Sequence, residues 1–526
     1  MFRKQKKLAT ALAGSCILAV AMTLPTAALS QNVLLKSNDG TLNLEGDLIS
    51  FDGEVYVIQT QLGDLRVSAG KVFCEGPGCP TLETIEADVK IAGAEAVAEG
   101  LMPLLLAGLA TDLGAASQAT NSDVEGEVVT ELTGSDGFGD YIGAYLVQSK
   151  SSDEAFTMLA DREIQVGVSS RRILPDEARN LSATGAGNMI DPAQEHIVAV
   201  DSLVVVVNRN NTLNSISKED AEKIYSGEVT NWSQLGGEDL PIIPVVQSEA
   251  GANNTFNDYL FGRPADAPAS AYEATDSTDA ALFVDQNPGA IAYVGFAFRR
   301  GQKSLDILSE CGISFEPSAF SAKTEEYPLF RRLYMYTRAD DDSALASDLV
   351  EFATSDASRD VILQSGYTDL TIERVTQGSN SARSIAALEA VEGSFEGDIV
   401  FDLVAKMGEY DRLTSTFRFR TGSNKLDERA KLDLERLAKY LEDMPEGTSV
   451  TLAGFADNVG AFEPNLDLSQ RRADRVREEL LRVGGDRLNG ITIETAGYGE
   501  VAPSACNTNE SGRRINRRVE TWVKTQ

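Results

Sequence analysis

Histidine is nearly missing from this chain of 526 residues, in which His196 is the only one. A zinc site that needs two or three imidazole ligands is therefore excluded, and no metal is expected. A Ser-His-Asp triad could use one histidine, but His196 enters an apolar run at 197–200, which favours a structural role at the start of a strand. The chain also lacks a P-loop, a Gly-x-Ser-x-Gly turn and a cofactor fingerprint. We therefore expect neither an enzyme nor a bound cofactor.

Positive charge is also scarce. Lysine and arginine number 47 against 80 aspartates and glutamates, which gives a formal net charge of −33. Such a surface repels nucleic acid and anionic lipid, because both carry dense negative charge. Nucleic acid is therefore not expected as a partner. Beyond the first thirty residues, no apolar run is long enough to cross a bilayer.

Residues 1–30 have the features of a signal peptide. Four cations precede an apolar stretch at 8–24, and small residues offer a cleavage site before Gln31. An uncleaved membrane anchor is the weaker interpretation, because Pro25 interrupts a short apolar run. A lipoprotein is disfavoured as well, since Cys16 lies inside that run rather than at its end. The leader predicts export to the periplasm.

Four cysteines follow the leader: Cys74, Cys79, Cys311 and Cys506. In an oxidising compartment Cys74 and Cys79 are the best pair, because the short spacer between them turns easily. Half a zinc site is the alternative, but no second close pair of cysteines exists. Cys311 and Cys506 stay unassigned, because four cysteines allow three pairings.

The length predicts about two to four domains. Residues 31–85 form a small β-rich module, because Asp-Gly turn signals separate segments of alternating hydrophobicity. Residues 86–375 alternate strands with helices, which indicates an α/β domain. Residues 376–412 are expected to form a polar linker with one helix at 385–391. Residues 413–526 form a compact final α+β domain.

Particular segments of the α/β stretch carry that prediction. We expect a strand at 89–92, a long helix at 96–109 and another strand at 164–169. The five apolar residues at 203–207 predict a strand that is buried on both faces, as in a parallel sheet. Ser217 is expected to cap the start of a helix.

Three sequence blocks mark the final domain. They are Gly-x-x-Asp-x-x-Gly at 454–460, Asn-x-x-Leu-Ser-x-x-Arg-Ala at 465–473 and Gly-Arg-x-x-Asn-Arg-Arg-Val-Glu at 512–520. In this order and spacing they resemble the OmpA-like peptidoglycan-binding domain. The resemblance covers essentially the whole final domain.

That resemblance implies a site for diaminopimelate, which presents an ammonium beside a carboxylate in the stem peptides of peptidoglycan. Such a zwitterion is held best by one fixed acid and one fixed guanidinium. The matching positions are Asp457 and Arg472, with Asn465 organising the loop and Thr421 and Gly422 bordering the pocket. Taken alone, Asp457 would be a turn residue and Arg472 a solvated arginine. Within the family pattern, peptidoglycan is the expected partner.

Three further segments carry a second resemblance. They are Asp-Ser-Leu-Val-Val-Val-Val-Asn at 201–208, Ile-Tyr-Ser-Gly-Glu-Val-Thr-Asn-Trp at 224–232 and Pro-Gly-Ala-Ile-Ala-Tyr-Val at 288–294. They are similar to the phosphate-binding proteins of ABC transporters, which are two-lobed periplasmic binding proteins of type II. The resemblance implies two strands that cross between the lobes, one of them near Val200. It also implies an oxyanion held in the cleft at helix N-termini.

The motifs of that cleft depart from the family. The residues expected to line it are Gly93, Ala94, Ser135, Asp136, Gly137, Ser169, Arg171, Gln247, Gly251 and Ala252. Family hydroxyls are missing at Ala94 and Ala252, and Gln247 stands where the family has an arginine. Each lost donor to an anion costs about 1.5–3 kcal/mol, so tight phosphate binding is not expected unless Arg171 compensates.

The fold class expected for the whole chain is therefore a β module, a two-lobed α/β domain and an OmpA-like α+β domain. In the first functional hypothesis, the final domain binds peptidoglycan close to the outer membrane. The two-lobed domain then binds a small solute, phosphate or another oxyanion, with an ABC transporter as a candidate partner. In the alternative hypothesis, the two-lobed domain has lost its ligand and contacts other envelope proteins.

Overall fold

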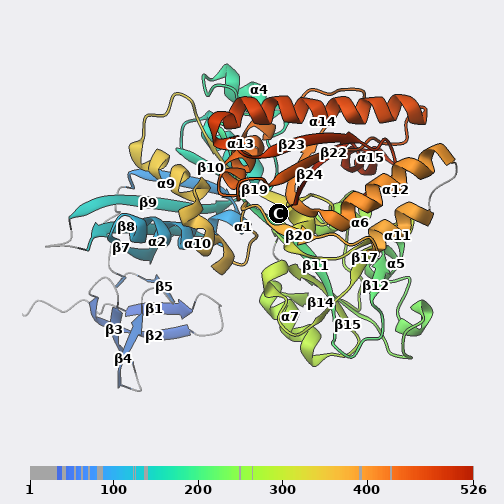
Figure 1. Cartoon of the computed structure of the whole chain (residues 1–526). Coiled ribbons are helices and arrows are strands. Elements are labelled where there is room, and N and C mark those ends of the chain that lie inside the picture. The colour runs from blue at the N-terminus through green and yellow to red at the C-terminus, as the bar shows by residue number, and fades with distance from the viewer. Residues whose placement is uncertain are drawn as a thin grey trace, which may run out of the picture. The chain divides into compact units, whose positions relative to one another are not determined.

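The computed structural model describes residues 32–37, 43–51, 55–60, 63–68, 72–76, 78–79, 87–122, 124, 126–135, 140–247, 250–263, 265–389, 394–426 and 429–524 (Figure 1). The expected signal peptide, residues 1–30, lies outside these described residues. The chain divides into two compact units, residues 1–84 and 85–526. Within the described part, none of the helices combines the length and apolar character that a membrane crossing requires.

The first unit contains one antiparallel sheet of five strands in the order β4-β3-β2-β1-β5. Val33, Leu35 and Ile58 lie in its core, because alternate side chains of a strand face the same side. A disulfide joins Cys74 on β5 to Cys79, which is the pairing expected for an oxidising compartment. The strands are β1 Asn32–Ser37, β2 Asn43–Phe51, β3 Val55–Thr60, β4 Gly63–Ser68 and β5 Val72–Glu75.

The second unit begins with an eleven-stranded sheet in the order β14-β13-β15-β11-β19-β10-β6-β9-β8-β7, in which β16 also pairs with β11. This sheet supplies both lobes of the α/β domain. Its strands are β6 Val89–Ala94, β7 Ala115–Asn121, β8 Glu127–Gly134, β9 Tyr141–Lys150, β10 Val166–Ser169, β11 Glu195–Val207, β13 Ile243–Gln247, β14 Tyr272–Ala274, β15 Ala290–Gly295, β16 Lys303–Ser304 and β19 Phe330–Thr337.

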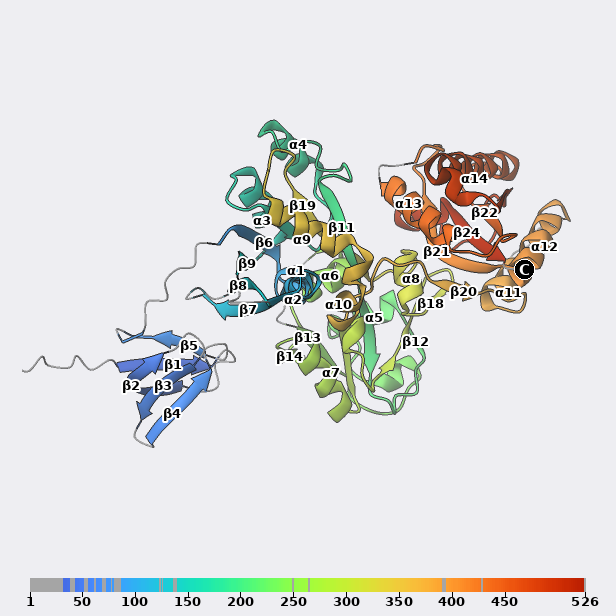
Figure 2. The same ribbon diagram turned by 60° about the vertical axis from the view of Figure 1, so that its left-hand side comes forward.

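The two lobes are joined by the long strands β11 and β19. β11 pairs with β19 along residues 195–202 and then with β15 along residues 203–207, so it leaves one lobe and enters the other (Figure 2). Each lobe has its own apolar core, one around Leu105 and the other around Phe256. The crossing strand expected near Val200 is therefore present.

Helices cover the sheet in both lobes. The first lobe contains α1 Glu95–Ala98, α2 Met102–Asp112, α3 Ser152–Ala160, α4 Pro175–Ala183, α9 Ala344–Thr354 and α10 Arg359–Gln364. The second lobe contains α5 Lys218–Tyr225, α6 Ala250–Phe261, α7 Ser277–Gln286 and α8 Ala319–Lys323. A small sheet beside it is formed by β12 Ser215–Ser217, β17 Asp306–Leu308 and β18 Ser314–Phe315.

Two local predictions for this domain are corrected. The single helix expected at 96–109 is two helices, because the chain turns at Gly100 and Pro103 occupies the first turn of α2, where its missing N–H costs nothing. The apolar run at 203–207 is buried as expected, but its neighbours β15 and β16 are antiparallel to it. An apolar run indicates burial and leaves strand direction open. The expected cap is correct, since the Ser217 side chain accepts a hydrogen bond from the N–H of Asp220.

The C-terminal domain contains a five-stranded mixed sheet in the order β20-β21-β24-β22-β23. Helices α13 and α14 pack on one face of this sheet around Leu437, Leu452 and Val476. Its strands are β20 Arg374–Thr376, β21 Asp411–Arg418, β22 Ser449–Gly454, β23 Thr492–Gly497 and β24 Arg518–Lys524. Its helices are α11 Ala382–Glu389, α12 Ser394–Glu409, α13 Arg429–Glu442, α14 Phe462–Gly484 and α15 Glu510–Asn516.

The segment expected as a linker, residues 376–412, holds α11 and α12. Leu403 and Met407 of α12 join Phe455 and Trp522 in a second apolar core on the other face of the C-terminal sheet. The mixed polar and apolar residues of this short segment do not show whether it packs on another part of the domain. The sequence alone therefore predicts a polar linker. In the structure this segment belongs to the C-terminal core.

The two domains of the second unit are covalently joined. A disulfide links Cys311, between β17 and β18, to Cys506, just before α15. Arg412 on β21 also donates to both carboxylate oxygens of Glu326, which precedes β19, at 2.7 and 3.1 Å. These contacts position the C-terminal domain against the segment that leads into a hinge strand.

Candidate functional site

Asp457 and Arg472 come from two elements that meet at one edge of the C-terminal sheet. Asp457 lies three residues after β22 ends, and Arg472 lies on α14, which packs on β22 and β23. Both side chains are buried, with 5% and 1% of their surface exposed. Side chains this buried carry charge only when hydrogen bonds compensate for lost water.

Main-chain carbonyls hold the guanidinium of Arg472. Its Nε donates to the carbonyl of Ser423 at 2.9 Å, its Nη2 to that of Arg420 at 3.2 Å and its Nη1 to that of Phe455 at 3.4 Å. Carbonyls accept these hydrogen bonds without neutralising the positive charge. An arginine has five N–H groups, so two remain without an acceptor among the described residues.

The electrostatic coupling between the two residues places them in one site. Burial lowers the pKa of Arg472 to about 10, while the negative charge of Asp457 works against that decrease. The Phe455 carbonyl that binds Arg472 lies only two residues before Asp457 along the chain. The expected acid and guanidinium are therefore brought together.

Arg517 supplies a second guanidinium to the same acid. Its Nη1 donates to Oδ2 of Asp457 at 2.6 Å, and its Nη2 donates to Glu510 at 2.6 Å. Among the described residues, the other oxygen of Asp457, Oδ1, accepts a hydrogen bond only from the main-chain N–H of Val459, at 3.2 Å. The carboxylate of Asp457 is thus held in place from one side and keeps lone-pair capacity on Oδ1.

The remaining expected residues surround this pair. Asn465 donates through Nδ2 to the carbonyl of Asp457 at 3.1 Å and also to Glu500 at 2.5 Å. Thr421 and Gly422 lie in the exposed loop after β21, whose neighbouring carbonyls hold Arg472. Gly422 has a φ of +65°, a left-handed conformation that glycine adopts without strain.

Sequence reasoning missed the partners that fix the acid. Arg517 belongs to the final motif without a predicted role, and no motif marks Glu510, which binds Arg517, or Glu500, which binds Asn465. The adjacent arginines Arg517 and Arg518 were the available signal, and both are buried, Arg517 against Asp457 and Arg518 against Glu520. Arg471, next to Arg472, points outward and lies 3.9 Å from Asp467 on the helix surface.

The structure also tests where the expected cleft residues lie. Gly93 and Ala94 end β6, and Ser169 ends the parallel neighbour β10, so these residues lie side by side in the first lobe. A Cβ at Gly93 would lie 1.9 Å from the carbonyl oxygen of Val168, so only glycine fits there. Ala94 precedes α1 without a capping side chain, and Glu95 places a carboxylate in its first turn.

Arg171 does not replace the donors to an anion that the cleft lacks, because its guanidinium is already paired with acids of the protein. Its guanidinium forms ion pairs with Glu177, at 2.6 Å, and with Asp153. The hydrogen bonds that Arg171 donates to Glu177 raise the pKa of Arg171 above its ordinary value. Ser169 is fully buried and donates through Oγ to the carbonyl of Arg171 at 2.7 Å. The guanidinium of Arg171 and the hydroxyl of Ser169 therefore both donate to groups of the first lobe itself.

The second lobe contributes Gln247 at the end of β13, with Gly251 and the buried Ala252 on the following helix α6. Gln247 is 2% exposed, donates to the carbonyl of Tyr293 and accepts a hydrogen bond from Ser277 at 3.1 Å. Its amide is therefore satisfied by the protein itself.

The expected place of Ser135 in the cleft is corrected, because this residue lies at the other end of the sheet. Gly93 pairs with Ser149 near the end of β9, whereas Ser135 follows the hairpin end where Thr133 pairs with Tyr141 at the start of β9. Asp136 and Gly137 lie outside the described residues. The glycine and serine pattern suggested donor capacity but could not say at which end of the sheet Ser135 lies.

A buried ion pair at the hinge was not predicted. Arg331 on β19 donates to Oδ2 of Asp201 on β11 at 2.8 Å, and its Nη1 reaches Thr255 on α6 at 3.4 Å. Oδ1 of Asp201 has no hydrogen-bond partner among the described residues. Arg331 and Asp201 lie on the hinge strands, and Thr255 lies on α6 of the second lobe. The Arg331 side chain therefore connects the hinge to α6.

Comparison with known proteins agrees with this architecture. A family model described as a PBP superfamily domain matches residues 79–357, more than half of the chain. The chain belongs to the PBP superfamily. The model of the OmpA family matches residues 418–517, so the domain that follows the PBP superfamily domain is OmpA-like. The predicted combination of these two folds is therefore confirmed.

Individual proteins show both similarities. The phosphate-binding protein PstS of Bacillus subtilis is 27% identical over 240 residues, 45% of this chain and 75% of PstS. The peptidoglycan-binding protein ArfA of Mycobacterium bovis is 40% identical over 90 residues, 17% of this chain and 26% of ArfA. The chain therefore spans about a quarter of the length of ArfA.

A solved structure is similar to the PBP superfamily domain. The ABC-type phosphate transport receptor from Vibrio cholerae is 19% identical, with a TM-score of 0.40, over 53% of this chain and 99% of the receptor. The families that match hold binding proteins and envelope proteins rather than enzymes.

Proposed function

We propose that this protein is a non-catalytic protein of the periplasm that binds peptidoglycan, next to the outer membrane, through its OmpA-like domain. Asp457 would bind the ammonium of diaminopimelate and Arg472 its carboxylate. The proposal is supported above all by the guanidinium of Arg472, which is buried beside Asp457 and bound by carbonyls that leave its charge uncompensated. An incoming carboxylate would supply the missing charge and bind the two remaining N–H groups.

The test is a titration of the mature chain with a muropeptide that contains diaminopimelate. We expect Asp457→Ala and Arg472→Ala each to weaken binding by about tenfold to a hundredfold, because each removes a charge-assisted hydrogen bond. Arg471→Ala is the matched control, because Arg471 lies on the same helix with its side chain on the outer surface. Equal affinity in all four proteins would refute the assigned pair.

For the two-lobed domain we propose binding of a small solute that is not tightly held phosphate. Gly93 and Ala94 still offer main-chain donors at the start of α1, but Glu95 adds negative charge there. Arg171 and Gln247 are both satisfied by protein groups. A small oxyanion bound weakly, passed to an ABC transporter, is the role that these donors support.

The second candidate is a two-lobed domain that binds no solute and contacts other envelope proteins. The inward-facing Arg171 and Gln247 favour it. Millimolar phosphate and sulfate added to the mature chain would distinguish the two, because a ligand that binds only the folded state raises the melting temperature. A rise that saturates with concentration supports solute binding, and an unchanged melting temperature supports the second candidate.

A further inference from the structure

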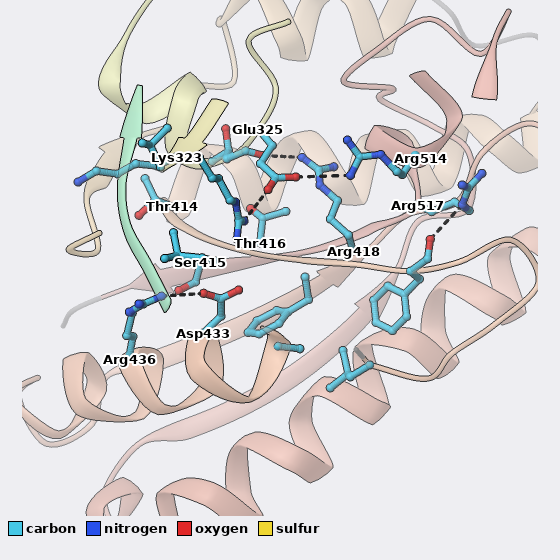
Figure 3. A pocket seen from close by; sticks show the side chains of 18 of the residues that line it. Lys323, Glu325, Thr414, Ser415, Thr416, Arg418, Asp433, Arg436, Arg514 and Arg517 are labelled. Carbon is cyan, nitrogen blue, oxygen red and sulfur yellow. Dashed lines mark hydrogen bonds and ion pairs between the residues drawn. The ribbon is translucent and has the colours of Figure 1, made fainter. Parts of the chain in front are cut away.

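A cavity of about 710 Å³ lies between the two domains of the second unit, apart from the solute cleft. The segment between α8 and β19 forms one side, and β21, the loop after it, α13 and α15 form the other. Figure 3 shows Arg418, Arg514 and Glu325 close together, with Arg436 and Asp433 on α13 apart from them. Both domains therefore contribute charged side chains to one enclosed space.

The lining of this cavity is basic although the chain is acidic. Nine of its side chains are lysine or arginine, and three are acidic, namely Glu325, Asp433 and Glu510. The whole chain carries a formal net charge of −33. Cations this close together repel one another. An anion that binds among them lowers the energetic cost of this repulsion.

Six of these nine cations form ion pairs, Lys323 with Asp369 and Arg517 with Asp457 among them. The three that form none among the described residues are Arg418, Arg420 and Lys425. Glu325 pairs with Arg332 at 2.5 Å and is also the acid nearest to Arg514, at 3.7 Å. Arg418 donates to the carbonyls of Ile515 and Thr324, and no carboxylate among the described residues forms an ion pair with it. Burial lowers the pKa of Arg418 to about 10, while the negative charges of Glu325 and Glu326 work against that decrease.

Two further cations face the open part of the cavity. Arg420 and Lys425 lie in the loop after β21 and are exposed. In the described part of the chain, neither side chain forms an ion pair. An anionic ligand that enters the cavity from solvent would therefore pass the positive charges of Arg420 and Lys425 before it reaches Arg418.

The geometry points to a binding site for a small polyanion, a molecule with two or more carboxylate or phosphate groups, in this cavity. The volume suits a molecule much larger than one oxyanion, since pockets of about 300–1,000 Å³ hold drug-sized ligands. Hydroxyls of Thr416 and Ser423 also line the space and can donate to anionic oxygens. Because both domains line the cavity, the bound polyanion would also bridge them. This inference goes beyond the proposed diaminopimelate site and the solute cleft, although Thr421 and Arg517 border both the cavity and the diaminopimelate site.

The experiment is calorimetric titration of the mature chain with citrate, pyrophosphate, phosphate and acetate at constant ionic strength. We expect citrate or pyrophosphate to bind saturably and at least about tenfold more tightly than phosphate or acetate, because each adds charge-assisted contacts. Citrate alone would indicate a carboxylate ligand, and pyrophosphate alone a phosphorylated one.

Matched variants locate the binding. Arg420→Gln with Lys425→Gln removes two charges from the cavity wall, and Arg475→Gln with Arg482→Gln removes two charges from the outer face of α14. We expect the first pair to weaken the polyanion at least about tenfold and the second to leave it within about twofold. Melting without ligand confirms that both pairs fold.

The inference is overturned if neither polyanion saturates at millimolar concentration. It is also overturned if the two pairs of variants weaken binding equally, because the effect would then be nonspecific attraction. Phosphate that binds the solute cleft is recognised by an affinity that the cavity variants leave unchanged, so failure here is distinct from failure of the proposed solute site.

Discussion

At the scale of single residues, the role proposed for Arg472 depends on the planar shape of its guanidinium as much as on its charge. Three main-chain carbonyls hold a planar guanidinium in one orientation. An ammonium group cannot reach three carbonyls in this plane and still present two parallel N–H groups to a carboxylate.

Arg472→Lys is therefore expected to lower the affinity for a diaminopimelate muropeptide by at least about tenfold although the charge is kept. Titration calorimetry measures the change, and Arg471→Lys is the control. A lysine variant with unchanged affinity would show that charge alone suffices and would contradict the role given to the carbonyls.

His196 supports a prediction about pH, because it is the only histidine in the chain. Burial lowers its pKa to about 4 from the ordinary 6.5, while a hydrogen bond with the main chain of Ala193 works against that decrease. Its Nε2 lies 3.2 Å from Oγ1 of Thr337 in a cavity that Arg338, Asp341 and Glu351 also line. The ring is neutral in the folded protein near neutral pH.

The unfolded chain takes up a proton near pH 6.5, whereas the folded chain does so only near pH 4. Stability is therefore complete above pH 6.5 and falls as the pH decreases toward 4. Between pH 7 and pH 5 we expect a loss of about 1–2 kcal/mol, reduced by the partial exposure of the ring. Urea unfolding at both values measures it, and His196→Gln should remove this difference. An equal difference in the variant would assign it to carboxyl groups instead.

At the scale of elements, buried charge connects β21 and β24 to α11. Glu520 on β24 is fully buried and accepts from Arg383 of α11 at 2.7 and 3.0 Å and from Arg518 at 2.6 Å. Arg412 of β21 lies 3.1 Å from it. Burial opposes ionisation, but the charges of these three arginines outweigh it and hold the pKa of Glu520 well below its usual range.

Glu520→Gln is expected to destabilise the protein by about 3–5 kcal/mol, because it leaves buried guanidinium groups without their acid. Chemical denaturation followed by tryptophan fluorescence reports it, since Trp522 also donates to Glu520 at 2.9 Å. Glu409→Gln is the matched control. Glu409 pairs with Lys524 at 2.7 Å on the surface, and its loss should cost at most about 1 kcal/mol. A small effect of Glu520→Gln would mean that the network repacks around the amide.

At the scale of the whole molecule, the Cys311–Cys506 disulfide joins the PBP superfamily domain to the OmpA-like domain across 195 residues of sequence. Closing so long a loop restricts the unfolded chain strongly. The same disulfide fixes the OmpA-like domain near Glu326, where Arg412 binds.

Cys311→Ser with Cys506→Ser is expected to lower the free energy of unfolding by about 3–5 kcal/mol and to separate the unfolding of the two domains. Calorimetry should then show two transitions in place of one for the second unit. Cys74→Ser with Cys79→Ser is the control, because this disulfide closes a short loop inside the first unit. Two domains that still unfold together without Cys311–Cys506 would show that ion pairs alone hold them.

Local patterns in the sequence predicted a good part of this molecule. The strand at 89–92, the cap at Ser217 and the pairing of Cys74 with Cys79 depend on residues close together in the chain, so short-range rules suffice. The prediction of a single helix at 96–109 is wrong, because Gly100 and Pro103 divide it into two helices and a periodic apolar pattern does not show that break.

The sequence by itself determined the kinds of domain present and singled out Asp457 and Arg472 as the pair for the proposed site, because motif spacing and hydrophobic periodicity are properties of neighbouring residues. Only the tertiary structure decided which arginine faces Asp457, that Ser135 lies away from the cleft, and that Cys311 meets Cys506. Those outcomes depend on segments far apart in the chain, whose contacts are set by packing and by the burial of charge.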